Sequence, residues 1–505
     1  MNDSIYSKPD PKLRQIFERA GSPDKVLCAP IDYAKTKHTV LFCDGRGDIL
    51  KKAFPIENSK SGLDSLIAEL KATCRHRGLS PDHAFFGGED VPAWAENFIC
   101  ALQDKGFPVA RVNAWEAKKQ RENQQASSDA LDLLGIAQCL LKCRGKLTPA
   151  VHDDYRLLRD LCRERHAVVD SNTALTNRLH NYVDRLFPEF LNVRNSGITP
   201  FSPLFWSLLQ DRFSAPQIAS RRSKSLIKVF QDHGVDNAAT AVDTLHALAR
   251  QSLSPVHSRV DGWQQIVESI AREWLVADAT INQFNRQIAA ILGRLPDALL
   301  TSIPGIGITL VSGCVSELGP VNEWPNLSRL CSYSGIIPAT KQTGGPDHAP
   351  QVLGVKKRCN RHLKNYILQA AMKMGQMGPP DLQERYCQIQ DRQGAANFVL
   401  AKELLGLFKS LLTRQTVFLP MRLYASDSRP EDRAAYFLEL WPKLRAKWQQ
   451  KAQVSQVFAP ETPLGKWRLM VQECYKISLP LPQSIRSNES QAGTSTTGAS
   501  PARLK

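Results

Sequence analysis

The sequence has a marked shortage of acidic residues. Its 505 residues contain 49 Asp and Glu against 65 Lys and Arg, which gives a formal net charge of +16. It also lacks any uncharged apolar run approaching 18 residues, and its first residues, MNDSIYSKPDPKLRQ, lack the apolar core of a signal peptide. These absences argue against a membrane protein and favour a polyanionic partner, nucleic acid rather than a membrane surface. We therefore expect no membrane partner and a cytoplasmic location.

Cysteine is present but lacks the spacing of a metal site. The 12 cysteines form no CxxC pair and no Cys/His cluster at zinc spacing. Cys139 and Cys143 stand four apart on an expected helix. We interpret them as small buried hydrophobic side chains, with a redox or metal pair as the alternative.

The length allows two to four domains at roughly 100–200 residues each. Composition and pattern divide the chain into six segments with different character. They are a flexible N-terminus (1–25), an α/β domain (26–149), a helical region (150–296), a mostly helical third domain (297–415), a helical extension (416–480) and a disordered tail (481–505).

The first domain alternates strand and helix patterns. Strands are expected over 25–34, 38–44, 48–56, 83–89 and 107–113, and helices over 61–78, 92–106 and 128–143. Three strands followed by alternating helix and strand predict an α/β fold with a mixed sheet. The pattern is compatible with an RNase H-like (RuvC-like) fold without singling it out.

The helical region contains two long amphipathic stretches, 155–187 and 262–295, joined by a segment broken by Pro and Ser. They predict a helical hairpin or coiled coil that serves as a dimerisation or spacer element. An ordinary helical domain is the alternative.

Four acids of the first domain form a candidate metal site. Asp32 and Glu89 end expected strands, and Asp129 and Asp132 stand three apart at the start of a helix, roughly 5–6 Å from each other on one face. Hard divalent cations prefer oxygen ligands, and two-metal phosphoryl transfer needs several carboxylates. Taken singly, Asp32 could be a turn residue and Asp129 a helix N-terminal residue stabilised by the dipole.

The third domain begins with a glycine-containing turn and continues into a basic segment. Gly305 and Gly307 lie in the turn of LTSIPGIGITLVSGCVSELG (300–319), which predicts a helix-hairpin-helix whose second helix receives a phosphate. A structural helix–helix turn is the alternative. Residues 338–375 contain one acid, Asp347, and seven basic residues, which indicate a nucleic-acid surface rather than a solvated helix face. The seven are Lys341, Lys356, Lys357, Arg358, Arg361, Lys364 and Lys373.

These motifs resemble one known family. The motifs of the first domain are Ile31–Lys35, Glu89, the dipeptide 112–113 and the D-x-x-D pair. Those of the third domain are IPGIG, LSRLCSYSGIIP (327–338), QTGG (342–345) and VKKRCNRHLK (355–364). Both sets are similar to motifs of the DEDD transposases of insertion sequence family one-hundred-and-ten. The resemblance implies a relation to the Piv DNA invertases and membership of a group of bridge-RNA-guided serine recombinases. The resemblance implies that Asp32, Glu89, Asp129 and Asp132 bind Mg²⁺ or Mn²⁺, and that Lys35 and Gly344 contact nucleic acid.

The resemblance also implies a nucleophile in the third domain. The family has a serine five residues after the proline that matches Pro338, and in this sequence that position is Thr343. A degenerate inactive copy, or attack by Ser332 or Ser334, remains open. Two further departures are Ser127–Ser128 where the family has Lys-Thr, and Cys359 where it has glycine.

The implied function is transposition or recombination of DNA through a covalent hydroxyl–phosphate intermediate. The implied partners are donor and target DNA, a structured guide RNA, and further copies of the chain in a dimer or tetramer. The expected location is the nucleoid of a bacterium or archaeon. The alternatives are a non-catalytic nucleic-acid-binding protein and a metal-dependent nuclease that uses water as nucleophile.

Overall fold

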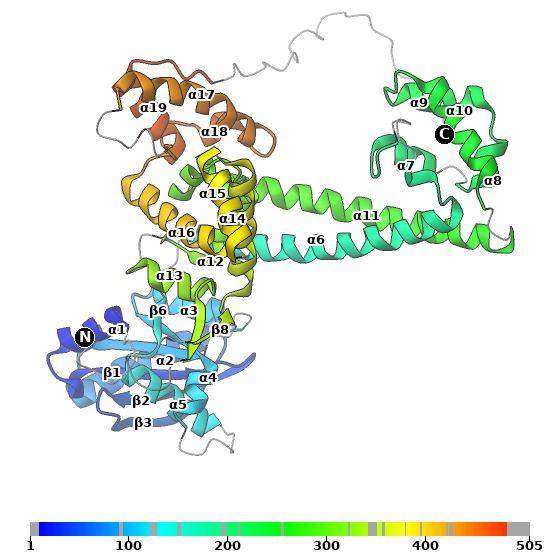
Figure 1. Ribbon diagram of the computed structural model, residues 1–505. Coiled ribbons are helices and arrows are strands. Elements are labelled where there is room, and N and C mark those ends of the chain that lie inside the picture. The colour runs from blue at the N-terminus through cyan, green and yellow to red at the C-terminus, as the bar shows by residue number, and fades with distance from the viewer. Residues whose placement is uncertain are drawn as a thin grey trace, which may run out of the picture. The chain divides into compact units, whose positions relative to one another are not determined.

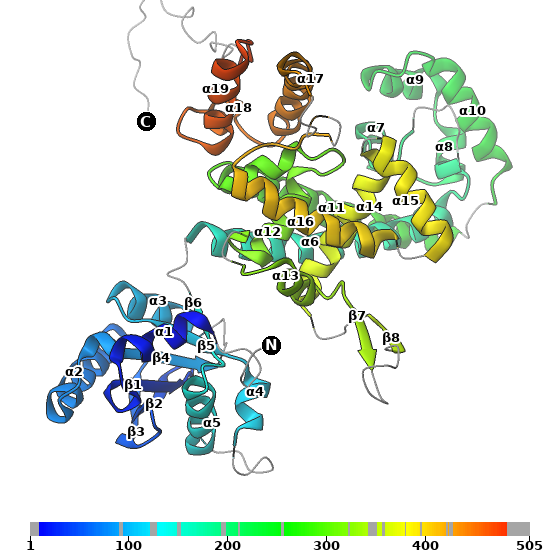
Figure 2. The same cartoon turned by 60° about the vertical axis from the view of Figure 1, so that its left-hand side comes forward.

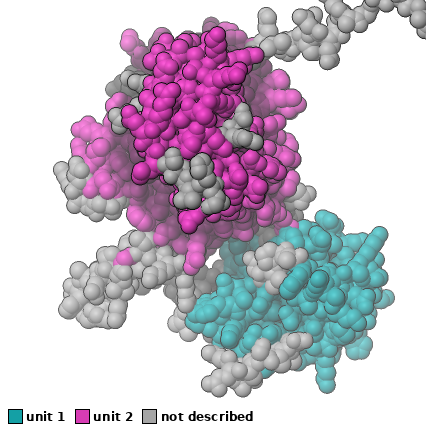
Figure 3. Space-filling model, turned by 90° about the vertical axis from the view of Figure 1, so that its right-hand side faces the viewer, with its two compact units in different colours: residues 1–152 teal, residues 153–505 magenta. Residues whose placement is uncertain are grey.

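The computed structural model describes most of the chain, and it divides into two compact units, residues 1–152 and 153–505. Figures 1 and 2 show the elements from two sides, and Figure 3 colours the units. The described residues are 10–89, 94–121, 129–148, 153–192, 198–210, 213–253, 257–321, 324–341, 351–355, 359–378, 380–393, 396–420, 423 and 428–481.

Unit 1 is built on a six-stranded mixed sheet with the order β3-β2-β1-β4-β5-β6. The strands are β1 (Leu27–Asp32), β2 (Lys37–Asp44), β3 (Ile49–Glu57), β4 (Ala84–Glu89), β5 (Val109–Val112) and β6 (Lys146–Thr148). β4 runs parallel to both β1 and β5, whereas β2, β3 and β6 pair antiparallel with their neighbours. The mixed α/β fold predicted from the sequence is confirmed, and its strand order is consistent with an RNase H-like arrangement.

Helices cover both faces of this sheet. They are α1 (Pro11–Ala20), α2 (Lys60–Arg77), α3 (Glu96–Asp104), α4 (Ala114–Lys119) and α5 (Asp129–Leu141), with short 3-10 turns η1 (Pro23–Lys25) and η2 (Pro81–His83). Successive residues of a strand point to opposite faces. Accordingly, Leu27, Ala29 and Ile31 of β1 share a core with α2 and α3. Cys28 shares the other core with α1 and α5.

Part of the expected flexible N-terminus is helical, which corrects that prediction. Helix α1 occupies Pro11–Ala20, and the Asp10 side chain caps it by accepting hydrogen bonds from the backbone N–H groups of Lys12 (2.8 Å) and Leu13 (3.1 Å). Leu13 and Ile16 are buried against the sheet. Their helical spacing was present in the sequence but was outweighed by the polar residues and prolines around it.

The thiols of Cys139 and Cys143 are buried in the same core as α1. Burial raises the pKa of each to about 11. Both are therefore protonated at neutral pH, as expected for small hydrophobic side chains rather than redox or metal ligands.

Unit 2 begins with two long helices that lie side by side as an antiparallel hairpin (Figure 1). They are α6 (Asp153–Leu186) and α11 (His257–Leu292), of 34 and 36 residues. The segment between them forms a small helical bundle at the far end, with a core rich in phenylalanine. Its elements are η3 (Phe190–Asn192), α7 (Pro203–Leu209), α8 (Ala215–Ser220), α9 (Ser223–Asp232) and α10 (Ala238–Gln251). The region thus combines the predicted hairpin with an ordinary helical domain.

The rest of unit 2 is a helical body from which a two-stranded hairpin projects (Figure 2). The body comprises η4 (Pro296–Ser302), α12 (Ile308–Leu318), α13 (Leu327–Ser334), α14 (Arg361–Met377), α15 (Pro380–Gln393) and α16 (Ala396–Arg414). The hairpin pairs β7 (Pro338–Lys341) with β8 (Gln351–Val355) in antiparallel register. Within the described residues, no helix is long and apolar enough to cross a bilayer.

The C-terminal extension is an integral part of this body. It contains α17 (Pro430–Gln449), α18 (Val454–Val457) and α19 (Pro463–Tyr475), of which α17 and α19 pack against η4 and α18 packs against α17. The indole of the buried Trp448 donates to the Thr301 hydroxyl (3.1 Å). The Lys447 ammonium donates to the carbonyl oxygens of Thr301 (2.7 Å), Ile303 (3.2 Å) and Ile306 (3.1 Å). The extension therefore completes the core around the glycine-containing turn.

Candidate active site

Asp32 and Glu89 lie next to each other at the edge of the sheet formed by the carboxyl-terminal ends of the parallel strands β1 and β4. Ile31 of β1 is paired with Gly88 of β4, so the residues that follow them occupy the next position on two parallel neighbours. In each strand the alternation of side chains places the acid on the face covered by α5. This register places Asp32 and Glu89 side by side, and their role as cation ligands stays a prediction.

Asp132 approaches the same edge from the face of the sheet that α5 covers. It lies in the first turn of α5, which packs across β1, β2, β4 and β5 through Leu133 and Ile136. Burial first, and then the negative charge of Asp132, raise the pKa of Glu89, while Arg121 opposes the shift. The two carboxylates therefore lie close enough to repel each other. Asp129 begins α5, and its side chain lies outside the described residues.

Arg121 is a member of this cluster that the sequence analysis missed. Its Nη2 lies 2.6 Å from Oδ1 of Asp132, and the two side chains are only 9% and 22% exposed. An ion pair this sheltered from water is stronger than a surface pair. In sequence, nothing distinguishes Arg121 from the exposed Lys118 and Lys119 beside it, because the contact depends on how α4 meets α5.

Glycines allow the elements around the site to approach closely. A Cβ at Gly135 would lie 2.5 Å from the Ala117 carbonyl oxygen, so α5 and α4 can touch only with glycine there. A Cβ at Gly88 would lie 2.3 Å from the ring of Tyr33, the residue after Asp32. Gly87 and Gly88 of β4 thus leave room for Leu140 of α5 and for Tyr33 beside the strand that ends in Glu89.

The acids provide ligands that suit a hard divalent cation. Carboxylate oxygens are the ligands that Mg²⁺ and Mn²⁺ prefer, and Asp32, Glu89 and Asp132 present them at one edge. Among the described side chains, no group of three or more His, Cys, Asp or Glu is placed so that it could hold a metal ion. Arg121 balances the charge of Asp132 in this arrangement, and a cation bound at Asp132 would compete with Arg121 for that carboxylate.

The candidate nucleophile lies in the part of the sequence between β7 and β8. Thr343 and Gly344 lie outside the described residues, as do Lys356, Lys357 and Arg358. Strand β7 ends at Lys341, two positions before Thr343. Of the other predicted nucleic-acid contacts, Lys35 is exposed in the loop after β1, and Arg361 is exposed at the first position of α14.

One of the two alternative nucleophiles is inaccessible. Ser334 is completely buried, and its hydroxyl donates to the carbonyl oxygen of Cys331 (3.1 Å) within α13. That alternative is therefore wrong for this conformation. Ser332 is half-buried on the same helix and remains an untested alternative.

The helix-hairpin-helix prediction is not confirmed. The element before the turn is the 3-10 helix η4, with all of its residues after Pro296 buried. Gly305 has a φ of 76°, and a Cβ there would lie 2.6 Å from the carbonyl oxygen of Lys373, so this glycine serves backbone packing against α14. Gly307 caps α12, and an added Cβ would meet no atom within 4 Å. Phosphate contact at Gly307 stays a prediction.

Comparison with known proteins agrees with both motif blocks. Residues 29–188 match the model of a DEDD transposase domain of IS110 type, described as "Transposase". Residues 297–387 match the model of the "Transposase IS116/IS110/IS902 family". The chain carries IS110-type transposase domains. IS110-type transposases are not serine recombinases, so that part of the earlier interpretation is corrected.

A curated relative gives the same result at low identity. The chain is 29% identical over 270 residues to the "Insertion element IS110 uncharacterized 43.6 kDa protein" of Streptomyces coelicolor. The aligned part covers 52% of this chain and 62% of the relative, so the chain spans less than two thirds of that protein's length.

Proposed function

We propose that the chain is a DNA transposase that cleaves and rejoins the strands of an insertion sequence. The observation that carries this proposal is the convergence of Asp32, Glu89 and Asp132 on one face and edge of a sheet, within a domain that matches IS110-type transposases. Such an acid cluster suits phosphoryl transfer, in which charge develops on the attacking and leaving oxygens.

In this proposal the three acids, together with Asp129, hold Mg²⁺ or Mn²⁺. The cation, when bound, would neutralise charge on the scissile phosphodiester. Tyr33 and Ile136 are buried in the cores on the two faces of the sheet, and low-dielectric surroundings of this kind strengthen electrostatic interactions beside them. Arg121 holds the Asp132 carboxylate through their ion pair until a cation takes its place.

Thr343 would supply the nucleophile. Its Oγ1 attacks the phosphorus, the P–O3′ bond breaks, and a phosphothreonine ester to the 5′ end forms while the departing strand gains a 3′-hydroxyl. The threonine proton passes to water, and the 3′-oxygen takes a proton from water. The number of phosphodiester bonds is conserved, so a 3′-hydroxyl of another strand can reverse the step and complete strand exchange.

The proposal includes RNA guidance and oligomerisation. Exposed basic residues such as Lys35 and Arg361 suit backbone contacts, which position a nucleic acid without reading its sequence. A structured guide RNA that pairs with donor and target DNA would supply the sequence specificity. The α6–α11 hairpin exposes Leu157 (49%) and Val276 (68%), apolar side chains that suit contact with further copies in a dimer or tetramer. Such a complex would work on the nucleoid.

The test combines the protein with 3′-labelled DNA spanning the end of its insertion sequence, RNA transcribed from the adjoining non-coding segment, and Mg²⁺. We expect a protein–DNA adduct that resists denaturant. Asp32→Asn should abolish both cleavage and adduct, because it removes a cation ligand. Thr343→Val should abolish the adduct, because it removes the nucleophilic oxygen.

Asp104→Asn is the matched control, since Asp104 is an exposed acid at the end of α3. It should cleave as the wild type does. Cleavage by the wild type without an adduct would indicate a nuclease that uses water and would contradict the proposal. Binding without cleavage would indicate a nucleic-acid-binding protein.

A further inference from the structure

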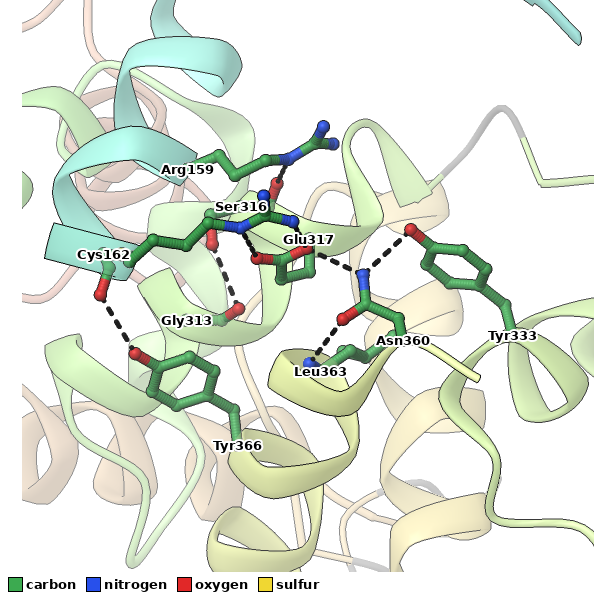
Figure 4. A network of polar contacts seen from close by, with 10 residues as sticks. Arg159, Cys162, Gly313, Ser316, Glu317, Tyr333, Asn360, Leu363 and Tyr366 are labelled. Atoms are coloured by element: carbon green, nitrogen blue, oxygen red, sulfur yellow. Dashed lines mark hydrogen bonds and ion pairs between the residues drawn. The ribbon is translucent and has the colours of Figure 1, made fainter. Parts of the chain in front are cut away.

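Unit 2 contains a buried carboxylate held by two other elements (Figure 4). Glu317 of α12 has a side chain that is 1% exposed. Its carboxylate accepts two hydrogen bonds from Arg163 of α6, at 2.8 Å from Nε and 2.9 Å from Nη2. It accepts a third from Nδ2 of Asn360 at 2.7 Å. A buried charge with three such partners fixes the elements that supply them.

Asn360 connects this carboxylate to two more helices. Its Oδ1 accepts from the backbone N–H of Leu363 (3.0 Å) and so caps α14. Its Nδ2 also donates to the hydroxyl of Tyr333 (2.9 Å), and its backbone N–H donates to the carbonyl oxygen of Tyr333 (3.0 Å). Tyr333 belongs to α13, so one asparagine joins α12, α13 and α14.

These contacts lie at both roots of the β7–β8 hairpin. Tyr333 comes five positions before Pro338, where β7 begins, and Asn360 comes five positions after Val355, where β8 ends. The hairpin projects from the body of its unit (Figure 2), so its direction depends on how its roots are held. Tyr333 and Asn360 bring the two roots together, and Glu317 attaches them to α6.

Helix α6 makes two further contacts with α12 and α14. Nε of Arg159 donates to the carbonyl oxygen of Ser316 (3.0 Å), and the hydroxyl of Tyr366 donates to the carbonyl oxygen of Cys162 (3.3 Å). Figure 4 shows these contacts beside the Glu317 carboxylate. Several hydrogen bonds therefore connect the helix of the long hairpin to the roots of β7–β8.

We propose that Glu317, Arg163 and Asn360 are positioning residues that aim the β7–β8 hairpin, and with it the loop that contains Thr343. This inference rests on the proposed function, in which Thr343 attacks DNA. A nucleophile displaced by about 1 Å loses on the order of 100-fold in rate. Loosening the hairpin roots should therefore slow adduct formation by about that factor without weakening DNA binding.

Asn360→Asp is the decisive variant. The aspartate retains the oxygen that caps α14, but it removes the donor to Glu317 and places a second carboxylate against it. We expect adduct formation at saturating DNA to slow about 100-fold with unchanged affinity. We also expect faster hydrogen–deuterium exchange in peptides covering 333–341 and 351–363. Asn326→Asp is the matched control, because Asn326 caps α13 by accepting from Arg329 (3.0 Å) and does not contact Glu317.

Two further variants check the interpretation of Asn360→Asp. Adding Glu317→Gln to Asn360→Asp restores a donor–acceptor pair with the polarity reversed, and it should recover much of the lost rate. Tyr333→Phe removes only one hydroxyl and should show the same changes to a smaller extent if Asn360→Asp is too unstable to study.

The rate of adduct formation and the hydrogen exchange together separate this inference from the proposed function. If the wild type forms no adduct, the proposed function fails, and hydrogen exchange still decides whether the contacts hold the hairpin roots. Unchanged exchange at the roots in Asn360→Asp would overturn the inference. So would faster exchange that leaves the wild-type adduct rate intact.

Discussion

Replacing Arg163 with methionine should destabilise unit 2 strongly, because it leaves a buried carboxylate without its cation. Methionine retains the length of the side chain and much of its apolar contact, so the change is mainly the loss of charge and of two hydrogen bonds to Glu317. Asn360 would still donate a hydrogen bond to that carboxylate.

The size of the effect follows from the burial of the pair. Removing one partner of a buried ion pair costs about 3–5 kcal/mol. The Glu317 side chain is 1% exposed, but that of Arg163 is 41% exposed, so solvent already screens part of the pair. We therefore expect a loss of about 3 kcal/mol in the free energy of unfolding at pH 7.5.

The loss should shrink as pH falls. Burial alone would raise the pKa of Glu317, but the hydrogen bonds and charge of Arg163 with the Asn360 contact outweigh it and lower that pKa. In the wild type this stabilisation is present above the unfolded pKa and is lost as pH falls through the lowered folded pKa. In Arg163→Met, burial prevails and the pKa of Glu317 rises above its usual value, so the carboxyl takes up a proton more readily as pH falls and part of the cost disappears.

Urea unfolding followed by tryptophan fluorescence measures this change, since seven of the nine tryptophans lie in residues 153–505. Lys443→Met is the control, because Lys443 pairs with Glu439 on the surface and both side chains are 65% exposed. The control should change stability by less than about 0.5 kcal/mol. A loss below about 1 kcal/mol in Arg163→Met, or a loss equal at pH 5 and 7.5, would refute the reasoning.

Three further changes have defined outcomes. Gly305→Ala should lower the free energy of unfolding, measured in urea, by about 2 kcal/mol or more, because φ is 76° and the new Cβ would lie 2.6 Å from the Lys373 carbonyl oxygen. Gly307→Ala should leave it unchanged, because its new Cβ would meet no atom within 4 Å. Burial raises the pKa of Asp297 to about 6, so stability falls as pH rises from about 4 to about 6; Asp297→Asn should stabilise by up to about 3 kcal/mol at pH 7.5 but not at pH 4, and equal effects at both would contradict this. Arg121→Gln removes the cation beside Asp132, so the melting temperature should fall without metal and rise more with Mn²⁺ than in the wild type, and equal Mn²⁺ shifts would count against the acid cluster as a cation site.

The edge of the sheet could be predicted from the sequence because its geometry is local. A strand pattern shows where a strand ends, and parallel neighbours end at the same edge, so Asp32 and Glu89 could be brought together without a structure. The D-x-x-D spacing likewise placed Asp132 on the same face of a helix as Asp129. The family motifs supplied the order of these elements.

Contacts between distant residues could not be predicted in this way. Arg163 and Glu317 are 154 positions apart, and neither lies in a pattern that would mark a buried ion pair. Lys447 and the turn it caps are separated by 141 to 146 positions. In the sequence, Arg121 is one of several basic residues near the end of a helix, and its contact with Asp132 depends on the packing of α4 against α5. These contacts depend on packing between elements, on which composition and periodicity give no information.

The most direct measurement identifies the residue that carries the DNA. Tryptic digestion of the adduct and mass spectrometry would examine residues 342–356, QTGGPDHAPQVLGVK, in which Thr343 is the only hydroxyl side chain. Residues 330–341 contain Ser332, Tyr333, Ser334 and Thr340 and form a separate peptide. We predict a nucleotide remnant on the 342–356 peptide. A remnant on the 330–341 peptide, or DNA cleaved with no modified peptide, would contradict the account.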